Sequence, residues 1–508
     1  MTERLPVDGR SLTLEQFLAV AHGGRRVDLA GSAIPGIQAS RRAVDQVVQA
    51  GRPVYGVTTG FGGLSHQVIP TTEAIALQFS LLRSHASGTG PALPADVVRG
   101  MLLLRANALS RGHSGVRQEL VERLIEFLNR DLVPFVPEQG SVGASGDLAP
   151  LAHLALTLLG EGEFVTAEGQ RIASADVHRN LGLKPLDLAE KEGVALINGT
   201  SLMTSYLALS VADGRELLAA AEVAAALSFD ALRGDPTSLD DRLGALRNLP
   251  EQRGVAESMR RLLHGSQLVR AGGEWHGQDP YTLRCIPQVL AATRQGLDYA
   301  ERVLTAELNA VSDNPVIFTP DEFVSGGNFH GQTLALALDT LALALHYLGA
   351  FAERRIARLV NPALNRGLPA FLAPAPGRSS GFMIPQYLAA ALVNENQTLV
   401  HPASAGSLPT SADHEDFVSM GAWAGAKLRR LLVNVQRIVA VEWIVAGQAL
   451  ELRHPLSGGV GSEAAWKVLR ERVPTWSEDR SPAADIERVA AGLADSSLVR
   501  QVRSVVPF

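Results

Sequence analysis

The sequence predicts a mainly α-helical fold, an elongated up-down helical bundle with a smaller mixed N-terminal region that carries the active-site loops. One observation is a set of long Ala- and Leu-rich segments at 201–232, 290–311, 333–361, 383–400 and 420–453. A second is that several of these segments, 437–453 among them, are apolar on nearly every side, so that each helix must be covered on more than one face. We therefore expect a large bundle together with burial between subunits.

The N-terminal region has a different pattern. Short helical segments separated by turns fill residues 12–50, and a Gly- and Thr-rich loop follows at 54–65. Residues 162–172 have period-two character around a Glu-Gly turn, which predicts a small hairpin. Because 508 residues exceed what one core usually supports, we predict two regions. The first is an N-terminal domain over 1–200, and the second is a helical bundle with C-terminal helices over 201–508.

Composition excludes several classes of function. The formal charge of −6 provides no general basic surface, so we expect no nucleic-acid partner. The single cysteine, Cys285, excludes an internal disulfide and fits a reducing compartment. The N-terminus lacks the apolar core of a signal peptide, and we expect a cytoplasmic protein. The chain has no His-Glu-x-x-His motif and no Cys/His pairs at zinc spacing, so we expect no metal site.

The most lipid-like stretch is residues 333–352. It contains Asp339 and His346 and runs directly into Glu353. A membrane span usually needs about 20 residues almost free of charge. We therefore expect a buried helix here and no membrane association.

The stretch "GSVGASGDLAPLAH" at 140–153 places three small residues, Ala144, Ser145 and Gly146, just before an apolar helix. The simpler interpretation is a helix cap, in which Ser145 or Asp147 accepts amide hydrogen bonds of that helix. The alternative is backbone chemistry. If the fold presses the nitrogen of Gly146 against the carbonyl carbon of Ala144, a ring can close with loss of water. Loss of a second water from Ser145 then gives a conjugated, electron-poor C=CH2 group.

The wider context resembles one family. The 140–156 stretch, "YGVTTGFG", "LINGT", "QDPYTLRCIPQ", "NAVSDNPV", "GGNFH" and "SADHEDFVSMG" are similar, in order across about 50–450, to landmarks of the aromatic amino acid ammonia-lyases and aminomutases. The resemblance implies a helical homotetramer with active sites shared between subunits. It also implies a small amino-acid substrate and a 4-methylidene-imidazole-5-one (MIO) group. That group forms autocatalytically from Ala144-Ser145-Gly146, with no external cofactor.

The resemblance also implies roles for individual side chains. Tyr55 is the base that takes the β-proton of the substrate, and because a free tyrosine titrates near about 10, we expect its pKa to be lowered. Arg284 suits the substrate carboxylate, since a guanidinium binds a carboxylate through two parallel bonds. The remaining matches hold the electrophile, the leaving group or the substrate, or wall the pocket: Tyr281, Asn198, Gln278 and Phe329. Ordinary structural roles stay open for Tyr55, Asn198 and Phe329.

Three positions bear on the substrate. The Ser84-His85 pair, Glu415 and Met383 resemble histidine-specific members of the family. A polar His85 can exchange a hydrogen bond with a substrate imidazole, and a carboxylate suits an imidazole N–H better than a phenyl ring. We predict elimination of ammonia from L-histidine to give trans-urocanate, the first step of histidine degradation. A tyrosine ammonia-lyase and an aromatic aminomutase remain alternatives, since "NFHGQTLALA" is closer to tyrosine-type members and Phe417 stands where a His is common. An inactive helical scaffold is a further alternative.

Overall fold

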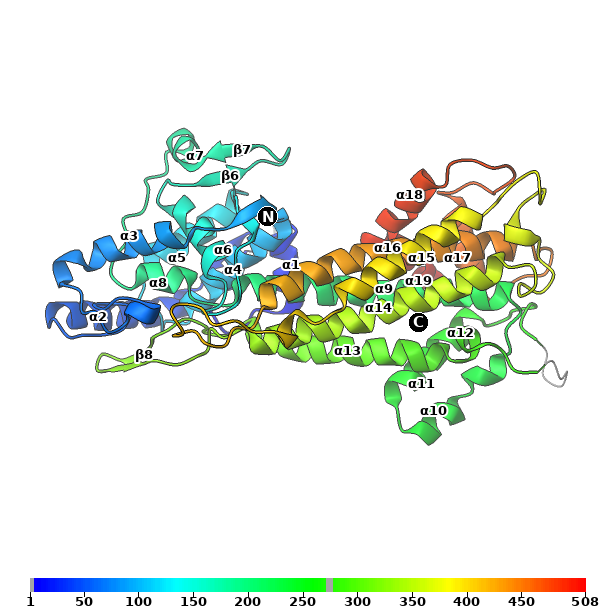
Figure 1. Cartoon of the computed structure of the whole chain (residues 1–508), viewed down its shortest axis with the longest axis horizontal. Coiled ribbons are helices and arrows are strands. Elements are labelled where there is room, and N and C mark those ends of the chain that lie inside the picture. The colour runs from blue at the N-terminus through cyan, green and yellow to red at the C-terminus, as the bar shows by residue number, and fades with distance from the viewer. Residues whose placement is uncertain (1–3, 271–276) are drawn as a thin grey trace. The chain divides into compact units, whose positions relative to one another are not determined.

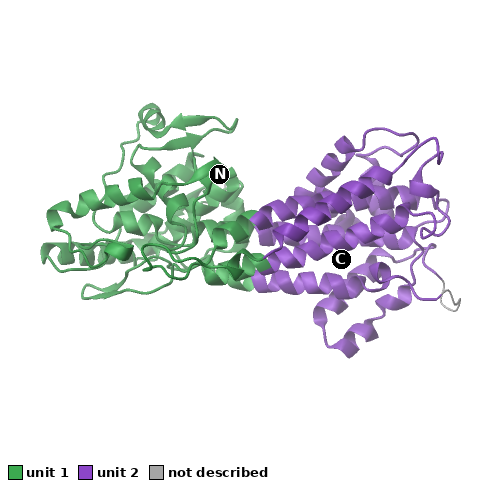
Figure 2. Cartoon of the chain, viewed as in Figure 1, with its two compact units in different colours: residues 1–209, 301–339, 402–426 green, residues 210–300, 340–401, 427–508 purple. Residues whose placement is uncertain are grey.

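The computed structural model describes residues 4–270 and 277–508. These residues form nineteen α-helices and nine short strands, so the predicted mainly α fold is confirmed (Figure 1). Contacts divide the chain into two compact units (Figure 2). Unit 1 comprises residues 1–209, 301–339 and 402–426, and unit 2 comprises residues 210–300, 340–401 and 427–508.

Unit 1 combines short helices with four small sheets. Its helices are α1 (Leu14–Ala21), α2 (Ile34–Gln49), α3 (Ala74–His85), α4 (Ala95–Ser110), α5 (Gln118–Asn129), α6 (Leu148–Leu158), α7 (Ser174–Leu181) and α8 (Glu192–Ile197). Its strands are β1 (Leu5–Val7), β2 (Val27–Leu29), β3 (Thr89–Ala92), β4 (Val133–Pro134), β5 (Pro137–Gln139), β6 (Glu163–Val165), β7 (Arg171–Ala173), β8 (Val316–Thr319) and β9 (Glu322–Val324). Strands β1 and β2 pair in parallel, whereas β3–β5, β4–β6–β7 and β8–β9 are antiparallel. The predicted hairpin at 162–172 is confirmed as β6–β7, with Phe164 opposite Ile172.

Four long helices run through both units. They are α9 (Ser201–Ala231), α13 (Ile286–Glu307), α14 (Gln332–Val360) and α16 (Gly421–Glu451). Most lie within two residues of the predicted segments, but α13 begins and ends four residues earlier than 290–311. Pro287 is tolerated there because the first helical turn has no intrahelical partner for its missing N–H. Every residue of α16 from 438 to 450 is buried, as its all-round apolar pattern predicts.

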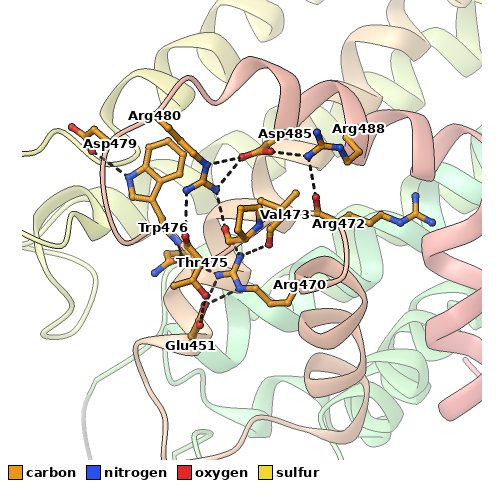
Figure 3. A network of polar contacts seen from close by, with 12 residues as sticks. Glu451, Arg470, Arg472, Val473, Thr475, Trp476, Asp479, Arg480, Asp485 and Arg488 are labelled. Carbon is orange, nitrogen blue, oxygen red and sulfur yellow. Dashed lines mark hydrogen bonds and ion pairs between the residues drawn. The ribbon is translucent and has the colours of Figure 1, made fainter.

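Unit 2 consists of helices and the loops that join them in the residues described. Besides the long helices it contains α10 (Asp241–Arg247), α11 (Pro250–Leu262), α12 (Tyr281–Arg284), α15 (Met383–Leu399), α17 (Val460–Arg470), α18 (Ala483–Ala494) and α19 (Ser497–Val505). A network of arginines and carboxylates ties the segment between α17 and α18 together (Figure 3). Within it Asp485 pairs with Arg480 at 3.0 Å and with Arg488 at 2.9 Å, and the guanidinium of Arg480 stacks over Trp476 at 4.4 Å.

Helix α14 contains the lipid-like stretch. Among the described residues it is the one helix long and apolar enough to cross a membrane, and 67% of its most apolar window is buried inside the protein. Asp339 in this helix is buried and accepts a hydrogen bond from the amide of Ser404 at 2.8 Å. The helix therefore packs as a core element that carries a satisfied polar group.

Candidate active site

The loop before α6 is shaped by two glycines that approach each other closely. Gly146 has a φ of +77°, and a Cβ on it would overlap the carbonyl group of Gly199. The amide of Gly199 donates to the carbonyl oxygen of Ser145 at 3.3 Å, and the amide of Asp147 donates to the carbonyl oxygen of Gly199 at 2.7 Å. The backbone on both sides of Gly146 is thus held by one residue, and only glycine fits at position 146.

Asp147 does not cap the helix that follows it, so the simpler interpretation of this stretch is wrong. Its buried carboxylate instead accepts the amides of Leu202 and Met203 at the start of α9, at 2.8 and 3.2 Å. Burial raises the pKa of Asp147 to about 7, against the lowering effect of these hydrogen bonds and of Arg105. The hydroxyl of Ser145 is not used as a cap either, since it donates to Glu415 Oε1 at 2.9 Å.

Five of the predicted site residues line one pocket of about 940 Å³ in unit 1. They are Tyr55, His85, Ser145, Asn198 and Glu415. Glu415 is held by Thr410, whose hydroxyl donates to its Oε2 at 3.2 Å. Ala144 and Gly146 are buried beside Ser145. The structure therefore brings Ser145 of the predicted electrophile segment (Ala144–Gly146), the predicted base Tyr55 and the predicted substrate contacts His85 and Glu415 to one cavity of the size of a ligand site.

Tyr55 lies in the loop after α2. The neighbouring Val57 anchors this loop in a core cluster with α2 and Ile317 of β8. The phenol oxygen of Tyr55 accepts a hydrogen bond from the amide of Gly62 at 3.4 Å. Burial and the charge of Glu415 nevertheless raise the pKa of Tyr55, so the expected lowering is wrong for the chain by itself. Both effects disfavour the phenolate.

His85 is the last residue of α3. Its Nδ1 lies 2.9 Å from the carbonyl oxygen of Leu81, which only accepts, so Nδ1 carries the proton and Nε2 is an acceptor. Burial lowers the pKa of His85, while the Leu81 carbonyl and Glu415 oppose that effect. The neutral imidazole is favoured, and in this tautomer Nε2 can accept a hydrogen bond from a polar ligand.

Asn198 is buried at the end of α8, and its carbonyl oxygen accepts a hydrogen bond from Arg105 at 2.8 Å. Arg105 lies in α4, 93 residues away, and was not anticipated as part of the site. Its signal was available in the sequence, because it interrupts the apolar run "MLLLRANAL" on a helix that is buried from Val97 to Ser110. Asp147 and Thr410 were likewise missed as supporting residues.

Four predicted residues belong to unit 2 and do not line this pocket: Gln278, Tyr281, Arg284 and Met383. Tyr281 and Arg284 lie on α12, where the guanidinium stacks 4.6 Å from the tyrosine ring and Nε donates to the carbonyl oxygen of Asp279 at 2.9 Å. Asp279 is itself fixed, since its carboxylate pairs with Arg366 at 2.6 Å and with Arg270. Gln278 and Tyr281 are exposed.

Met383 is the first residue of α15. Asp479 accepts the amides of Ser380 and Gly381 just before it, at 2.7 and 3.1 Å, and Trp476 donates to Asp479 at 3.2 Å (Figure 3). The last predicted residue, Phe329, is half-buried between β9 and α14 in unit 1 and does not line the pocket. Among the described residues no group of three or more His, Cys, Asp or Glu side chains could hold a metal ion.

Residues 12–471 match the model of the aromatic amino acid lyase family. The chain belongs to this family. The membership inferred from the motifs is confirmed. This aromatic amino acid lyase is 50% identical over 498 residues to the histidine ammonia-lyase of Symbiobacterium thermophilum, covering 98% of each chain. It is 49% identical over 494 residues to that of Deinococcus radiodurans, covering 97% of this chain and 94% of that one.

Solved structures of the aromatic amino acid lyase fold are also similar. The tyrosine aminomutase of Streptomyces globisporus has a TM-score of 0.94 at 38% identity, covering 100% of this chain and 99% of that one. The histidine ammonia-lyase of Trypanosoma cruzi has a TM-score of 0.92 at 41% identity, covering 99% and 96%. One fold therefore serves lyases and aminomutases with different substrates, and the substrate must be argued from the pocket.

Proposed function

We propose that this aromatic amino acid lyase is a histidine ammonia-lyase, which eliminates ammonia from L-histidine to give trans-urocanate. The observation that carries the proposal is the pocket in which Ser145 lies beside Tyr55, His85 and Glu415. The relatives that are histidine ammonia-lyases, at up to 50% identity over nearly the whole chain, support the same substrate.

The residues 144–146 fit the MIO group. Position 146 admits only glycine, the backbone is clamped on both sides of it, and the hydroxyl that must leave is the one bonded to Glu415. Ring closure joins the nitrogen of Gly146 to the carbonyl carbon of Ala144. The Ala144 oxygen leaves as water with the N–H protons of Gly146 and Ser145, and a C=N bond forms between that carbon and the nitrogen of Ser145. The α-proton and hydroxyl of Ser145 leave as a second water, and no oxidant is needed. The group supplies an electron-poor alkene that assists departure of the substrate amine.

The other side chains of the pocket bind and orient the substrate and move its protons. Neutral His85 presents Nε2 as an acceptor for the single N–H of a neutral substrate imidazole, and Glu415 is the alternative acceptor for that N–H. Tyr55 takes the β-proton as general base. Its raised pKa must be offset by groups that this chain does not place beside it, such as cations brought by another copy.

We infer a homotetramer in which each active site takes Gln278, Tyr281, Arg284 and Met383 from other copies. Exposed apolar side chains support this assembly. Leu336, Leu343 and Tyr347 lie on one side of α14 and are 52%, 43% and 38% exposed. On α15, Ile384 and Tyr387 are 57% and 61% exposed. Faces of this kind mark protein interfaces. We also propose a cytoplasmic location and no external cofactor.

A second candidate is an aminomutase or lyase acting on tyrosine. The similarity to the tyrosine aminomutase, and the "NFHGQTLALA" segment, favour it. An assay panel of L-histidine, L-tyrosine and L-phenylalanine distinguishes the two, because each elimination product absorbs in the ultraviolet at its own wavelength. We expect turnover of L-histidine, and preference for L-tyrosine would contradict the proposal.

The inactive-scaffold alternative is tested by intact mass. We expect the purified protein to weigh less than its sequence by two water molecules. Ser145→Ala should abolish turnover while the protein stays folded, because the alkene carbon comes from the Ser145 side chain. Full mass in the wild-type protein, or full activity in Ser145→Ala, would refute the electrophile.

A further inference from the structure

Arg105 is the buried cation nearest to the electrophile segment in the contacts described above. Its side chain is 0% exposed in the middle of α4, and among the described residues it forms no ion pair. One guanidinium nitrogen, Nη1, donates to the carbonyl oxygen of Asn198 at 2.8 Å, while Nε and Nη2 have no hydrogen-bond partner in the described part of the chain. Burying a cation without a hydrogen-bonded carboxylate is unfavourable for folding.

The contact of Arg105 continues to the electrophile segment through a single peptide unit. The carbonyl oxygen of Asn198 and the amide N–H of Gly199 belong to the same peptide group. Arg105 binds the oxygen of that group, and its N–H donates to the carbonyl oxygen of Ser145 at 3.3 Å. A charged donor on an amide oxygen polarises the amide and strengthens the hydrogen bond that its N–H makes.

The geometry at Gly199 keeps this connection in place. Its φ is +155°, and a Cβ there would overlap Arg105 Nη1 and approach Ser312. The amide of Asp147 donates back to the carbonyl oxygen of Gly199 at 2.7 Å. The peptide between Asn198 and Gly199 is therefore held by Arg105 at its oxygen and by Ser145 at its N–H, and Asp147 holds the next peptide. Side-chain bulk at Gly199 would break the contact with Arg105.

The oxygen at the end of this chain of contacts is where negative charge develops. When Ser145 loses its α-proton, the electron pair delocalises onto its carbonyl oxygen. The pair then forms the Cα=Cβ bond as the Cβ–Oγ bond breaks. The hydroxyl combines with a proton and leaves as water. A donor placed at an oxygen that gains charge lowers the barrier of such a step.

We propose that Arg105 is a positioning residue for formation of the electrophile, acting through the Asn198–Gly199 peptide to stabilise negative charge on the Ser145 carbonyl oxygen. This inference rests on the proposed function, since it concerns the same modification of Ser145.

The carboxylates near Arg105 are bound to other groups, so the charge of Arg105 acts on the Asn198 carbonyl oxygen. Asp313 is already engaged, because it pairs with buried Lys191 at 2.8 Å and accepts from Ser114 at 3.1 Å. Asp147 is occupied by the two amides of α9. Burial lowers the pKa of Arg105, but both carboxylates oppose that effect, and a guanidinium stays protonated in proteins.

The test is a time course of maturation in full-length protein. Wild type, Arg105→Gln and Arg105→Lys are expressed, sampled after induction, and weighed intact to follow loss of the two waters. Folding is checked by circular dichroism and thermal unfolding. Because glutamine is neutral, we expect Arg105→Gln to mature about tenfold more slowly or worse. Lysine keeps the charge but reaches less far, and Arg105→Lys should fall between the two.

Arg355 provides the matched control. It is also 0% exposed, but it pairs with Glu442 at 2.5 Å and lies in unit 2. Arg355→Gln should lower stability and leave the rate of water loss unchanged. A folded Arg105→Gln that matures at the wild-type rate would overturn the inference, and so would equal slowing in Arg355→Gln.

If Arg105→Gln does not fold, the inference is tested with Arg105→Lys alone. Slower water loss in Arg105→Lys supports the inference, and a wild-type rate overturns it. Failure of the proposed function has a different signature, because the wild-type protein would then keep its full mass.

Discussion

At the scale of single residues, the site depends on which atom each polar group contacts. The sequence motifs identified Tyr55, His85 and Glu415, and the structure brings all three to one pocket. Motifs could not show that Ser145 bonds to Glu415, 270 positions away, or that burial raises the pKa of Tyr55. Those properties depend on neighbours from distant segments, which one sequence without its fold does not reveal.

The influence of Glu415 on Tyr55 gives a prediction for pH dependence. The carboxylate raises the pKa of Tyr55, so removing its charge in Glu415→Gln should lower that pKa. In a plot of kcat/KM against pH, the limb that rises with pH reports the pKa of the base in the free enzyme. This limb should then move to lower pH. The measurement is a pH–rate profile with the preferred substrate.

Thr410→Val is the control, because it removes the hydroxyl at 3.2 Å from Glu415 and leaves the carboxylate charge in place. Its limb should stay where the wild-type limb lies. An unmoved limb in Glu415→Gln would show that Tyr55 does not set it.

At the scale of elements, the positions of the long helices could be predicted from the sequence, but the contacts between helices and loops could not. Periodicity over many residues located α9, α14, α15 and α16 to within two residues, because a long apolar pattern averages over local exceptions. Asp147 looked like a cap for its own helix, yet it caps α9 instead. Short-range cap signals cannot distinguish these outcomes, since both satisfy amides at a helix N-terminus.

The cap on α9 predicts how stability changes with pH. The pKa of Asp147 is raised to about 7 by burial, above its ordinary value of 3.8. The native state therefore holds a proton that the unfolded chain releases, and the free energy of unfolding falls as pH rises from about 4 to about 7. Asp147→Asn should flatten that fall, and between pH 5 and pH 8 the effect should be on the order of 3 kcal/mol at most. Urea unfolding at pH 5 and pH 8 measures it.

Asp230→Asn provides a comparison, because Asp230 should also affect the free energy of unfolding in the same range of pH. Burial raises the pKa of Asp230 to about 6, so its contribution should end at lower pH than that of Asp147. If Asp147→Asn retained the full wild-type pH dependence, the carboxyl group would not be the source of it.

At the scale of the whole molecule, the pocket of unit 1 is lined by Ser145 of the proposed electrophile, by the proposed base Tyr55 and by His85 and Glu415, but its lining includes no arginine. The predicted carboxylate anchor, Arg284, belongs to unit 2. No pattern in one sequence states which copy of a chain supplies which residue. The surplus of apolar helices and the family resemblance indicated from the sequence that assembly matters, and the exposed stripe on α14 supports it.

Shared sites predict complementation between inactive variants. Tyr55→Phe and Arg284→Gln should each be nearly inactive alone. When they are co-expressed, mixed assemblies should regain part of the activity, because some sites combine an intact Tyr55 from one copy with an intact Arg284 from another. The measurement is specific activity of the co-purified, differently tagged pair.

The control pair is Tyr55→Phe with Ser145→Ala, whose residues line the same pocket of one chain. That mixture should stay inactive. Absence of recovery in the first pair, with mixed assemblies demonstrated, would contradict sharing of sites.

Residues late in the chain support the 140–147 loop, and this determines when during synthesis the loop can reach its final structure. Ser419 donates to the carbonyl oxygen of Gly143 at 3.1 Å, and the amide of Met420 donates to that of Val142 at 2.9 Å. A ribosome has therefore translated more than four-fifths of the message before this support can form. On the proposed function, we expect a nascent polypeptide stalled earlier to carry an unmodified Ser145, and we expect the MIO group to form only when synthesis is nearly complete.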